Sequence, residues 1–408
     1  MDSQRVINLS GWIRNYNFMR KLEHIIPILL FSIIWGAVEF LLPVRFSDAG
    51  ISIEKISILF FISSFVSIVM DIPSGKLSDR IGRERLIVYS MSLSAIALAS
   101  LYFFDSFAIF LAASILIGVA YGLNWSPILA FVGDHSDGSN HGRAFGDFFT
   151  LTALGEALAP ILIAILIIYS SSSFPFLILA LISMICLFTF KHLIKDRRVK
   201  VFGGKILDGS LSHLNSLKLI KKALIPSIFL MATGFFVAVF WQSVWFTQPL
   251  IGFYEKTLLD SALIVAVFSL PMVLCSRFMG RMIDKAGEKK VFFFSAFGTI
   301  ISFFLFYLSQ TLIFKLVFIF TASLGVLGIW LVMDVITVKL FPKNERGEFF
   351  GIIETVRDTA YAITPLFIGF TYKILGLNGI FAVNSIIAIL LVFLGVYSFG
   401  KIRLSANI

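Results

Sequence analysis

The stretch Gly75-Lys-Leu-Ser-Asp79-Arg-Ile-Gly82-Arg83 is polar and lies between two long apolar runs. A second polar stretch, Gly280-Arg-Met-Ile-Asp284-Lys-Ala-Gly287, repeats its spacing 205 residues further along the 408-residue chain. The same offset joins other identical residues: Trp125 and Trp330, Gly142 and Gly347, Phe145 and Phe350, Gly146 and Gly351, and Pro160 and Pro365. Chance matches at one fixed offset are improbable, so the sequence indicates a duplication in which one polar connection marks the same place in each half.

The composition indicates a membrane protein. Hydrophobic residues make up 58% of the chain, charged residues 14%, and the mean hydropathy is +0.94, whereas soluble domains have about 25% charged residues. Cys186 and Cys275 both lie in apolar runs, which argues against a disulfide framework and against a metal cluster. The first apolar run lacks a cleavage site of small residues, so we expect it to be a retained span.

Twelve apolar runs are long enough to cross a bilayer, for which roughly 20 residues are needed. They are 25–45, 55–74, 86–104, 107–132, 144–169 and 174–191, then 224–247, 258–279, 291–309, 312–340, 349–372 and 379–400. The sequence therefore predicts an all-α integral membrane protein with twelve transmembrane helices in two pseudo-symmetric six-helix bundles.

The runs divide the chain into five parts. Residues 1–24 form a cytoplasmic segment with a possible interfacial helix at 5–22, and residues 25–191 form the first bundle. Residues 192–222 form a polar cytoplasmic linker, residues 223–400 the second bundle, and residues 401–408 a cytoplasmic tail.

The distribution of Lys and Arg predicts the orientation. Few basic residues fall on the side opposite the N-terminus: Arg45, Lys55, Lys256, Lys315 and Lys373. Because basic loops stay in the cytoplasm, both termini are expected inside. The net charge of +10 is then a topology signal, and nucleic acid is not an expected partner.

The polar stretch after the second of twelve spans closely resembles the signature of the major facilitator superfamily. Asp71-Ile-Pro73-Ser-Gly75 resembles the acidic-x-Pro-Ser/Thr-Gly lead-in of one bacterial branch. This resemblance implies two bundles related by an axis along the membrane normal, each an inverted repeat. It places spans 1, 4, 7 and 10 around a central cavity, with spans 2, 5, 8 and 11 beside it. It also implies a monomer in a bacterial inner membrane, a small-molecule substrate, and neither cofactor nor metal.

Ionisable residues inside the spans agree with that arrangement, because a charge deep in a bilayer costs about 2.5–3.5 kcal/mol and faces a cavity or a partner. They are Glu39, Glu156, Asp334, Glu354, Arg357 and Asp358, and none lies in the interior of spans 3, 6, 9 or 12. Glu39 and Glu156 are predicted proton carriers; the alternative for each is a structural hydrogen bond. Arg357 is predicted to bridge Asp334 and Glu354, with Asp358 pointing elsewhere.

The resemblance implies that Asp79 contacts the start of span 11 and holds a cytoplasmic gate closed. The alternative is that the charged residues of this stretch only set the membrane topology. The predicted gate residues are Asp71, Gly75, Asp79, Arg80, Gly82, Arg83, Asp134, Gly280, Asp284 and Gly287. The second copy has Glu288 where the first has Arg83. The predicted cavity residues are Trp35, Asn124, Phe240, Trp241, Gln242 and Trp245; lipid-facing or interfacial positions are the alternative for the tryptophans.

Span 5 carries Gly146, Gly155 and Ala159-Pro160, a degraded form of the motif of drug–proton antiporters, while span 4 has Ser114 where that pattern has Arg. The chain lacks a phosphate-binding loop, so an ion or substrate gradient must supply the energy. The predicted function is proton-coupled export of a small amphipathic or drug-like compound. Proton-coupled or facilitated uptake of a small nutrient is the alternative, and a non-transporting receptor or assembly partner is a remote one.

Overall fold

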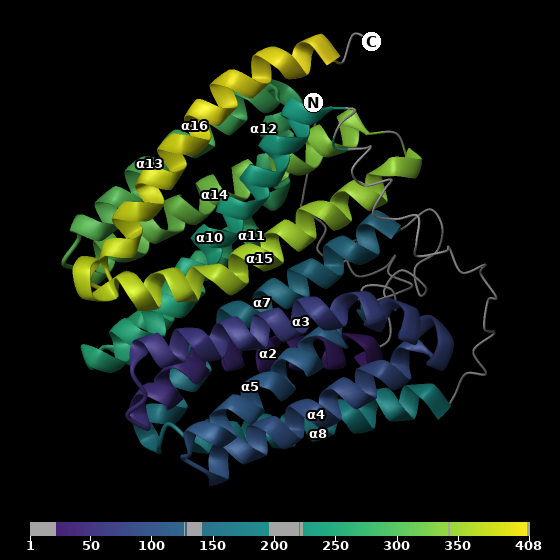
Figure 1. Cartoon of the computed structure of the whole chain (residues 1–408), viewed down its shortest axis with the longest axis vertical. Helices are drawn as coiled ribbons and strands as arrows, with labels where there is room; N and C mark the ends of the chain where they lie inside the picture. Colours follow the sequence, from purple (N-terminus) through teal and green to yellow (C-terminus); the bar gives the residue numbers. More distant parts are fainter. Residues whose placement is uncertain are drawn as a thin grey trace, which may run out of the picture.

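The computed structural model describes residues 22–125, 127–128, 141–195, 220, 223–341 and 343–405, and the statements below concern these ranges. They are folded into α-helices (Figure 1). The first half contains α2 (Leu22–Asp48), α3 (Ile53–Ile81), α4 (Arg83–Phe103), α5 (Phe107–Gly122), α7 (His141–Tyr169) and α8 (Phe174–Lys195). The second half contains α10 (Leu224–Tyr254), α11 (Leu258–Leu274), α12 (Ser276–Ala286), α13 (Glu288–Leu308), α14 (Leu312–Leu340), α15 (Lys343–Leu375) and α16 (Gly379–Ser405).

These runs become helices because a helix satisfies its own backbone hydrogen bonds, which lipid cannot do. Hydroxyl side chains inside the helices follow the same rule by donating to a carbonyl one turn earlier. Ser32 donates to the carbonyl oxygen of Ile28 at 2.8 Å, and Ser243 donates to that of Val239 at 2.6 Å. Large apolar side chains such as Phe294 and Phe393 are about two-thirds exposed, as expected of a surface that faces lipid.

Most predicted spans overlap one helix each, and span 8 overlaps the pair α11 and α12, which bend by 54° at Cys275. Of predicted span 4 (107–132), α5 covers only Phe107–Gly122. Within the described residues, eight helices are long and apolar enough to cross a membrane, and the bent pair makes up to nine. Two further apolar helices, Phe107–Gly122 and Phe174–Phe188, are shorter. Helix α15 is long but carries Glu354, Arg357 and Asp358.

The two halves repeat one packing pattern. In the first half α2 packs on α7, α3 on α5, and α4 on α8; in the second half α10 packs on α15, α11 on α14, and α13 on α16. The halves meet through α3 with α15, α7 with α11, and α2 with α10. Figure 1 shows the purple-to-blue half below the green-to-yellow half, with α3 and α15 alongside each other at their left ends and diverging to the right.

The repeated polar stretches end at two glycines with positive φ. Gly82 (φ 96°) separates α3 from α4, and Gly287 (φ 84°) separates α12 from α13, a conformation that suits glycine alone. The polar stretch that begins at Gly75 was expected to connect two spans, but it is not a separate loop, because α3 continues to Ile81. A helix keeps its backbone bonded while its polar side chains reach water, so polarity alone does not end it. We call this end of the molecule the motif side and the other end the far side.

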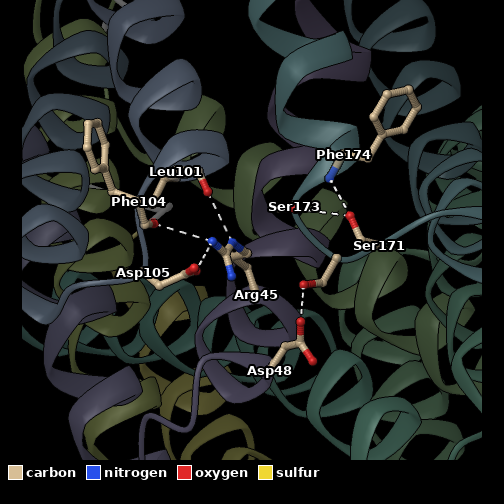
Figure 2. A network of polar contacts seen from close by, with 9 residues as sticks. Arg45, Asp48, Leu101, Phe104, Asp105, Ser171, Ser173 and Phe174 are labelled. Atoms are coloured by element: carbon tan, nitrogen blue, oxygen red, sulfur yellow. Dashed lines mark hydrogen bonds and ion pairs between the residues drawn. The ribbon is translucent and has the colours of Figure 1, made fainter.

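On the far side, Arg45 of α2 ties the end of α4 to the first bundle (Figure 2). Arg45 is 4% exposed; its Nε donates to the carbonyl oxygen of Leu101 at 3.0 Å and its Nη2 to that of Phe104 at 3.3 Å. Its guanidinium also pairs with Asp105 and lies 5.5 Å from the ring centroid of Phe110. The last carbonyls of a helix have no partner within it, so Arg45 completes the end of α4.

Nearby, Asp48 at the end of α2 accepts a hydrogen bond from Ser172 in the α7–α8 connection. In the same connection, the Oγ of Ser171 accepts from the backbone N–H of Phe174 at 3.3 Å. At the far side of the first bundle, polar side-chain contacts therefore join α2 to the end of α4 and to the α7–α8 connection.

Candidate functional site at the meeting of the two halves

Helices α2 and α7 pack closely because glycines remove side chains from their contact. A Cβ on Gly36 would lie 2.9 Å from the Cα of Glu156, and one on Gly155 would lie 2.5 Å from the Cβ of Ser32. Small residues allow such close approach between membrane helices. As a result Glu39 of α2 and Glu156 of α7 lie near enough to interact electrostatically.

Glu39 and Glu156 are both half-buried as whole residues. Within the described part of the chain neither takes part in a hydrogen bond or an ion pair, so the alternative of a structural hydrogen bond has no partner in this structure. Two negative charges held close repel, and the pair gains free energy by taking up a proton or a cation.

Aromatic side chains stand beside this pair. The ring of Trp35 meets Tyr121 edge to face, with centroids 4.9 Å apart, and Tyr121 stacks on Trp125 at 6.0 Å. Tyr121 interacts electrostatically with Glu39 and Glu156. It also interacts with Asp358 and Tyr361 of α15, so Tyr121 marks where the two halves come together. Sequence reasoning missed Tyr121; its spacing of four residues from Trp125 was the available signal.

Arg357 is 7% exposed and belongs to a cluster in the second half. Its Nη1 lies 2.6 Å from a carboxylate oxygen of Glu354, and its guanidinium stands 3.9 Å from the ring centroid of Trp330. The predicted bridge to Asp334 was wrong as a direct ion pair in the described residues. Trp330 lies one turn before Asp334; its ring stacks on the guanidinium while its indole N–H donates to Asp334, which leaves Asp334 and Arg357 to interact at longer range.

The expectation that Asp358 points elsewhere was also wrong. Asp358 interacts electrostatically with Glu354 and Arg357 on its own helix and with Tyr121 of the other half. Tyr361, which the sequence analysis did not select, shares a hydrogen bond with Arg357. Residues one turn apart on one helix face explain this grouping.

The predicted cavity residues divide into two groups. Trp35 adjoins the carboxylate pair, and Trp241 stacks on Trp245 along α10 with centroids 6.4 Å apart. Gln242 is buried next to Trp241. These positions remain candidates for contact with a substrate.

Asn124 and Phe240 lie elsewhere. Asn124 is fully buried and donates from Nδ2 to the Oγ of Ser90 at 3.0 Å, which places it between α4 and the fourth span. Phe240 is fully buried against Phe303 of α13, with centroids 5.5 Å apart. Each of these contacts lies inside one bundle, and the assignment of both residues to the cavity stays a prediction.

Comparison with known proteins decides the family. The family model described as Major Facilitator Superfamily matches residues 26–262 and 230–404. The chain belongs to the Major Facilitator Superfamily. It is therefore a multi-pass membrane protein, and the relatives that it matches are named as transporters or exporters.

Solved transporters share the fold of this superfamily member. The nucleoside transporter NupG superposes with a TM-score of 0.75 at 15% identity, over 93% of this chain and 98% of that one. A POT family transporter in complex with 5-aminolevulinic acid gives a TM-score of 0.73 at 14% identity, over 93% and 96%. At these identities the likeness concerns the fold alone.

Curated relatives are distant. The bacillibactin exporter of Bacillus subtilis is 27% identical over 132 residues, 31% of this chain and 33% of that protein. A probable 4-methylmuconolactone transporter of Cupriavidus pinatubonensis is 28% identical over 32% of this chain and 30% of its own length. An uncharacterized MFS-type transporter of Schizosaccharomyces pombe is 25% identical over 70% of each. This chain thus spans about a third of the length of the first relatives that it matches.

For this transporter, several predicted gate side chains lie outside what the structure describes. They are Asp71, Gly75, Asp79, Arg80 and Asp134. Gly82 and Gly287 form the two turns, Gly280 has open space around it, and Asp284 is exposed. Arg83 begins α4, and Glu288, which replaces it in the second copy, begins α13. Glu288 pairs with Lys339 of α14, so the departure from the motif serves a contact within the second bundle.

On the far side the two halves of the transporter are joined by an ion pair that the sequence did not predict. Lys373 near the end of α15 lies 2.6 Å from a carboxylate oxygen of Glu54 at the start of α3, and the hydroxyl of Tyr372 donates to the same carboxylate at 3.5 Å. Hydrogen bonding to Glu54 raises the pKa of Lys373. Gly369 packs against Ser57 one turn further in. These contacts hold the far side together.

Neutralising this pair is expected to favour states in which the far side is open. In Lys373→Gln the contact between α3 and α15 loses one charge; because the Lys373 side chain is largely exposed, the equilibrium should shift by about two- to fivefold. Double electron–electron resonance measures the far-side distance distribution between two spin labels. The labels are attached at Tyr169→Cys and Gln310→Cys, which are exposed positions on different halves.

Glu54→Gln should give the same shift, whereas Lys289→Gln, an exposed change on the motif side, should give none. An unchanged distance distribution in both Lys373→Gln and Glu54→Gln would show that the pair does not hold the two halves.

Proposed function

We propose that this transporter exports a small amphipathic or drug-like compound in exchange for protons, with Glu39 and Glu156 as the proton carriers. The observation that carries the proposal is the pair itself: two carboxylates from different helices, held together by glycine contacts, half-buried, and without hydrogen-bond partners in the described residues. A proton taken up by the pair removes their repulsion, and a proton released restores it.

In this proposal Glu39 and Glu156 are accessible to the two sides of the membrane in turn. Tyr121 links the pair to α15 of the other half, and the halves meet through α3 with α15 and α7 with α11. Rocking of the halves about this region opens one side while it closes the other, as in alternating access. A transmembrane potential of 100 mV supplies about 2.3 kcal/mol for each charge that crosses.

The orientation and the surroundings belong to the same proposal. Basic residues are rare on the far side, so the motif side and both termini face the cytoplasm. The protein acts as a monomer in a bacterial inner membrane, and the span 5 glycines with Pro160 favour exchange over symport.

Asp79 is proposed to hold the cytoplasmic gate. Near the first turn of α15 its carboxylate would accept from free backbone N–H groups and interact favourably with the helix dipole. Asp79→Asn is expected to lower the transport rate by about tenfold or more while substrate affinity changes little, because the change shifts a balance between states. Initial rates in proteoliposomes, compared with equilibrium binding, separate the two effects.

Glu255→Gln is the control, since Glu255 is an exposed acidic residue at the end of α10 on the far side. Equal loss of binding and rate in Asp79→Asn, or full activity, would contradict the gate.

Uptake of a nutrient is the second candidate. Ser114 in place of an arginine departs from the antiporter pattern, and one relative is named a probable 4-methylmuconolactone transporter. Export is favoured by the carboxylate pair between α2 and α7 and by the relative named a bacillibactin exporter.

The direction of coupling distinguishes the two candidates. Purified protein is reconstituted into proteoliposomes with an interior one pH unit more acidic or more alkaline than the medium, and ethidium, bacillibactin and 4-methylmuconolactone are offered in turn. Exchange for protons predicts accumulation in acidic vesicles, because protons leave as substrate enters. Symport predicts accumulation in alkaline vesicles. Accumulation that ignores the pH gradient for every probe would contradict both forms of proton coupling.

A further inference from the structure

Negative charge outweighs positive charge where the two halves meet. Glu39 and Glu156 come from the first half, and Asp334 and Asp358 from the second, each half-buried. Within the described residues, Arg357 is the basic side chain that lies with these acids. The ends of α2, α14 and α15 carry other cations, but Arg45 and Lys373 pair with acids on the far side and Lys339 pairs with Glu288.

Arg357 is engaged mainly by its own cluster, although its buried Nε has no hydrogen-bond partner among the described residues. Its Nη1 is paired with Glu354 at 2.6 Å, one face is covered by Trp330 at 3.9 Å, and Tyr361 hydrogen-bonds to it. The charge of Arg357 is therefore largely balanced inside its own cluster, and Glu39 and Glu156 have no basic partner in the described residues.

Rings complete the surroundings of the carboxylate pair. Tyr121 interacts electrostatically with Glu39, Glu156 and Asp358, and Trp35 lies against it at 4.9 Å. The indole Nε1 of Trp35 has no hydrogen-bond partner in the described part of the chain. Aromatic faces beside carboxylates attract organic cations, because the ring face is electronegative and the acids supply the opposite charge.

We infer that the substrate is an amphipathic organic cation, whose charge lies between Glu39 and Glu156 and whose apolar body lies against Tyr121 and Trp35. This inference rests on the proposed export function and names its substrate class. The cation and the protons compete for the same carboxylates, so binding of one releases the other to solution. From α15, Tyr361 interacts electrostatically with Glu39, and Asp358 interacts with Tyr121 and with Arg357 of its own helix.

Two probes of the same shape and opposite charge test the inference directly: tetraphenylphosphonium and tetraphenylborate. Equilibrium binding of each to the purified full-length protein in detergent is measured without any gradient. We expect tetraphenylphosphonium to bind at least about tenfold more tightly and to release protons in weakly buffered solution. Equal or tighter binding of tetraphenylborate would overturn the inference, as would failure of tetraphenylphosphonium to bind.

Variants then locate the charge. Glu156→Gln and Glu39→Gln are each expected to weaken tetraphenylphosphonium binding about tenfold while leaving tetraphenylborate binding equal or stronger. Glu255→Gln, an exposed change at the end of α10, should alter neither. Tyr121→Phe should retain binding because it keeps the ring, and Tyr121→Leu should lose it. Thermal unfolding of each variant shows that the fold is intact. Unchanged cation binding in both glutamine variants would place the charge elsewhere and reject the site.

These outcomes are separate from those of the proposed function. Selective cation binding without proton release, or without response to a pH gradient in vesicles, would leave the substrate class standing and reject proton exchange. Gradient-driven transport combined with a preference for tetraphenylborate would do the reverse.

Discussion

Gradient-driven accumulation is expected to be abolished when Glu39 and Glu156 are both replaced by glutamine. Glutamine keeps the size and polarity of the side chain but cannot take up or release a proton at neutral pH. With one proton exchanged per substrate, a gradient of one pH unit supports an accumulation ratio of about ten, since 1.4 kcal/mol corresponds to a factor of ten. The double variant should give a ratio of about one.

Accumulation of ethidium in acidic proteoliposomes measures this ratio. Exchange of internal for external ethidium without a gradient should persist at high ethidium concentration, because that process needs no proton although the loss of both carboxylates weakens binding of the cation. The single variants Glu39→Gln and Glu156→Gln show which carboxylate carries the proton, and Glu255→Gln serves as the control. A double variant that accumulates ethidium as the wild type does would remove both residues from the coupling mechanism.

The second large effect concerns packing. Gly155→Leu is expected to lower the stability of the protein severely, because its Cβ would stand 2.5 Å from the Cβ of Ser32 and 3.1 Å from the backbone nitrogen of Ile33. Neither neighbour is a flexible side-chain tip, so α2 must move away from α7. Overpacking a close contact costs about 1–3 kcal/mol and can cost more, and here it also separates Glu39 from Glu156.

Thermal unfolding in detergent and the yield of folded protein measure this effect. Gly298→Leu is the matched control: Gly298 lies within α13, and a Cβ there would have no neighbour within 4 Å among the described residues. A Gly155→Leu protein as stable and as active as the Gly298→Leu protein would contradict the close packing of α2 and α7.

Much of the fold follows from the sequence because lipid imposes strong rules. Continuous apolar runs must be helices, and the offset of 205 residues reveals the duplication. The cost of a buried charge also singles out α2, α7, α14 and α15 as the helices that carry ionisable groups within their apolar stretches.

Partners across helices were harder to predict. Asn124 and Phe240 are predicted to line a cavity, yet helices that are apolar all round give no sign of which face turns inward, and the contacts of each residue lie inside one bundle. Arg357 was predicted to meet Asp334 because both lie at a similar depth from the turn between spans 10 and 11. Equal depth does not show that Trp330 occupies the space beside the guanidinium. Tyr121 was missed because its one-turn spacing from Trp125 is common among so many aromatic residues, and only its contacts with other helices distinguish it.

The central claim is that protons move opposite to substrate through Glu39 and Glu156, and internal pH is its most direct readout. Proteoliposomes are loaded with the pH indicator pyranine, with equal pH on both sides, and ethidium is added outside. The account predicts that the interior becomes alkaline as ethidium enters, and that Glu39→Gln/Glu156→Gln vesicles show no change. Ethidium entry into wild-type vesicles with no change in internal pH, or with acidification, would contradict it.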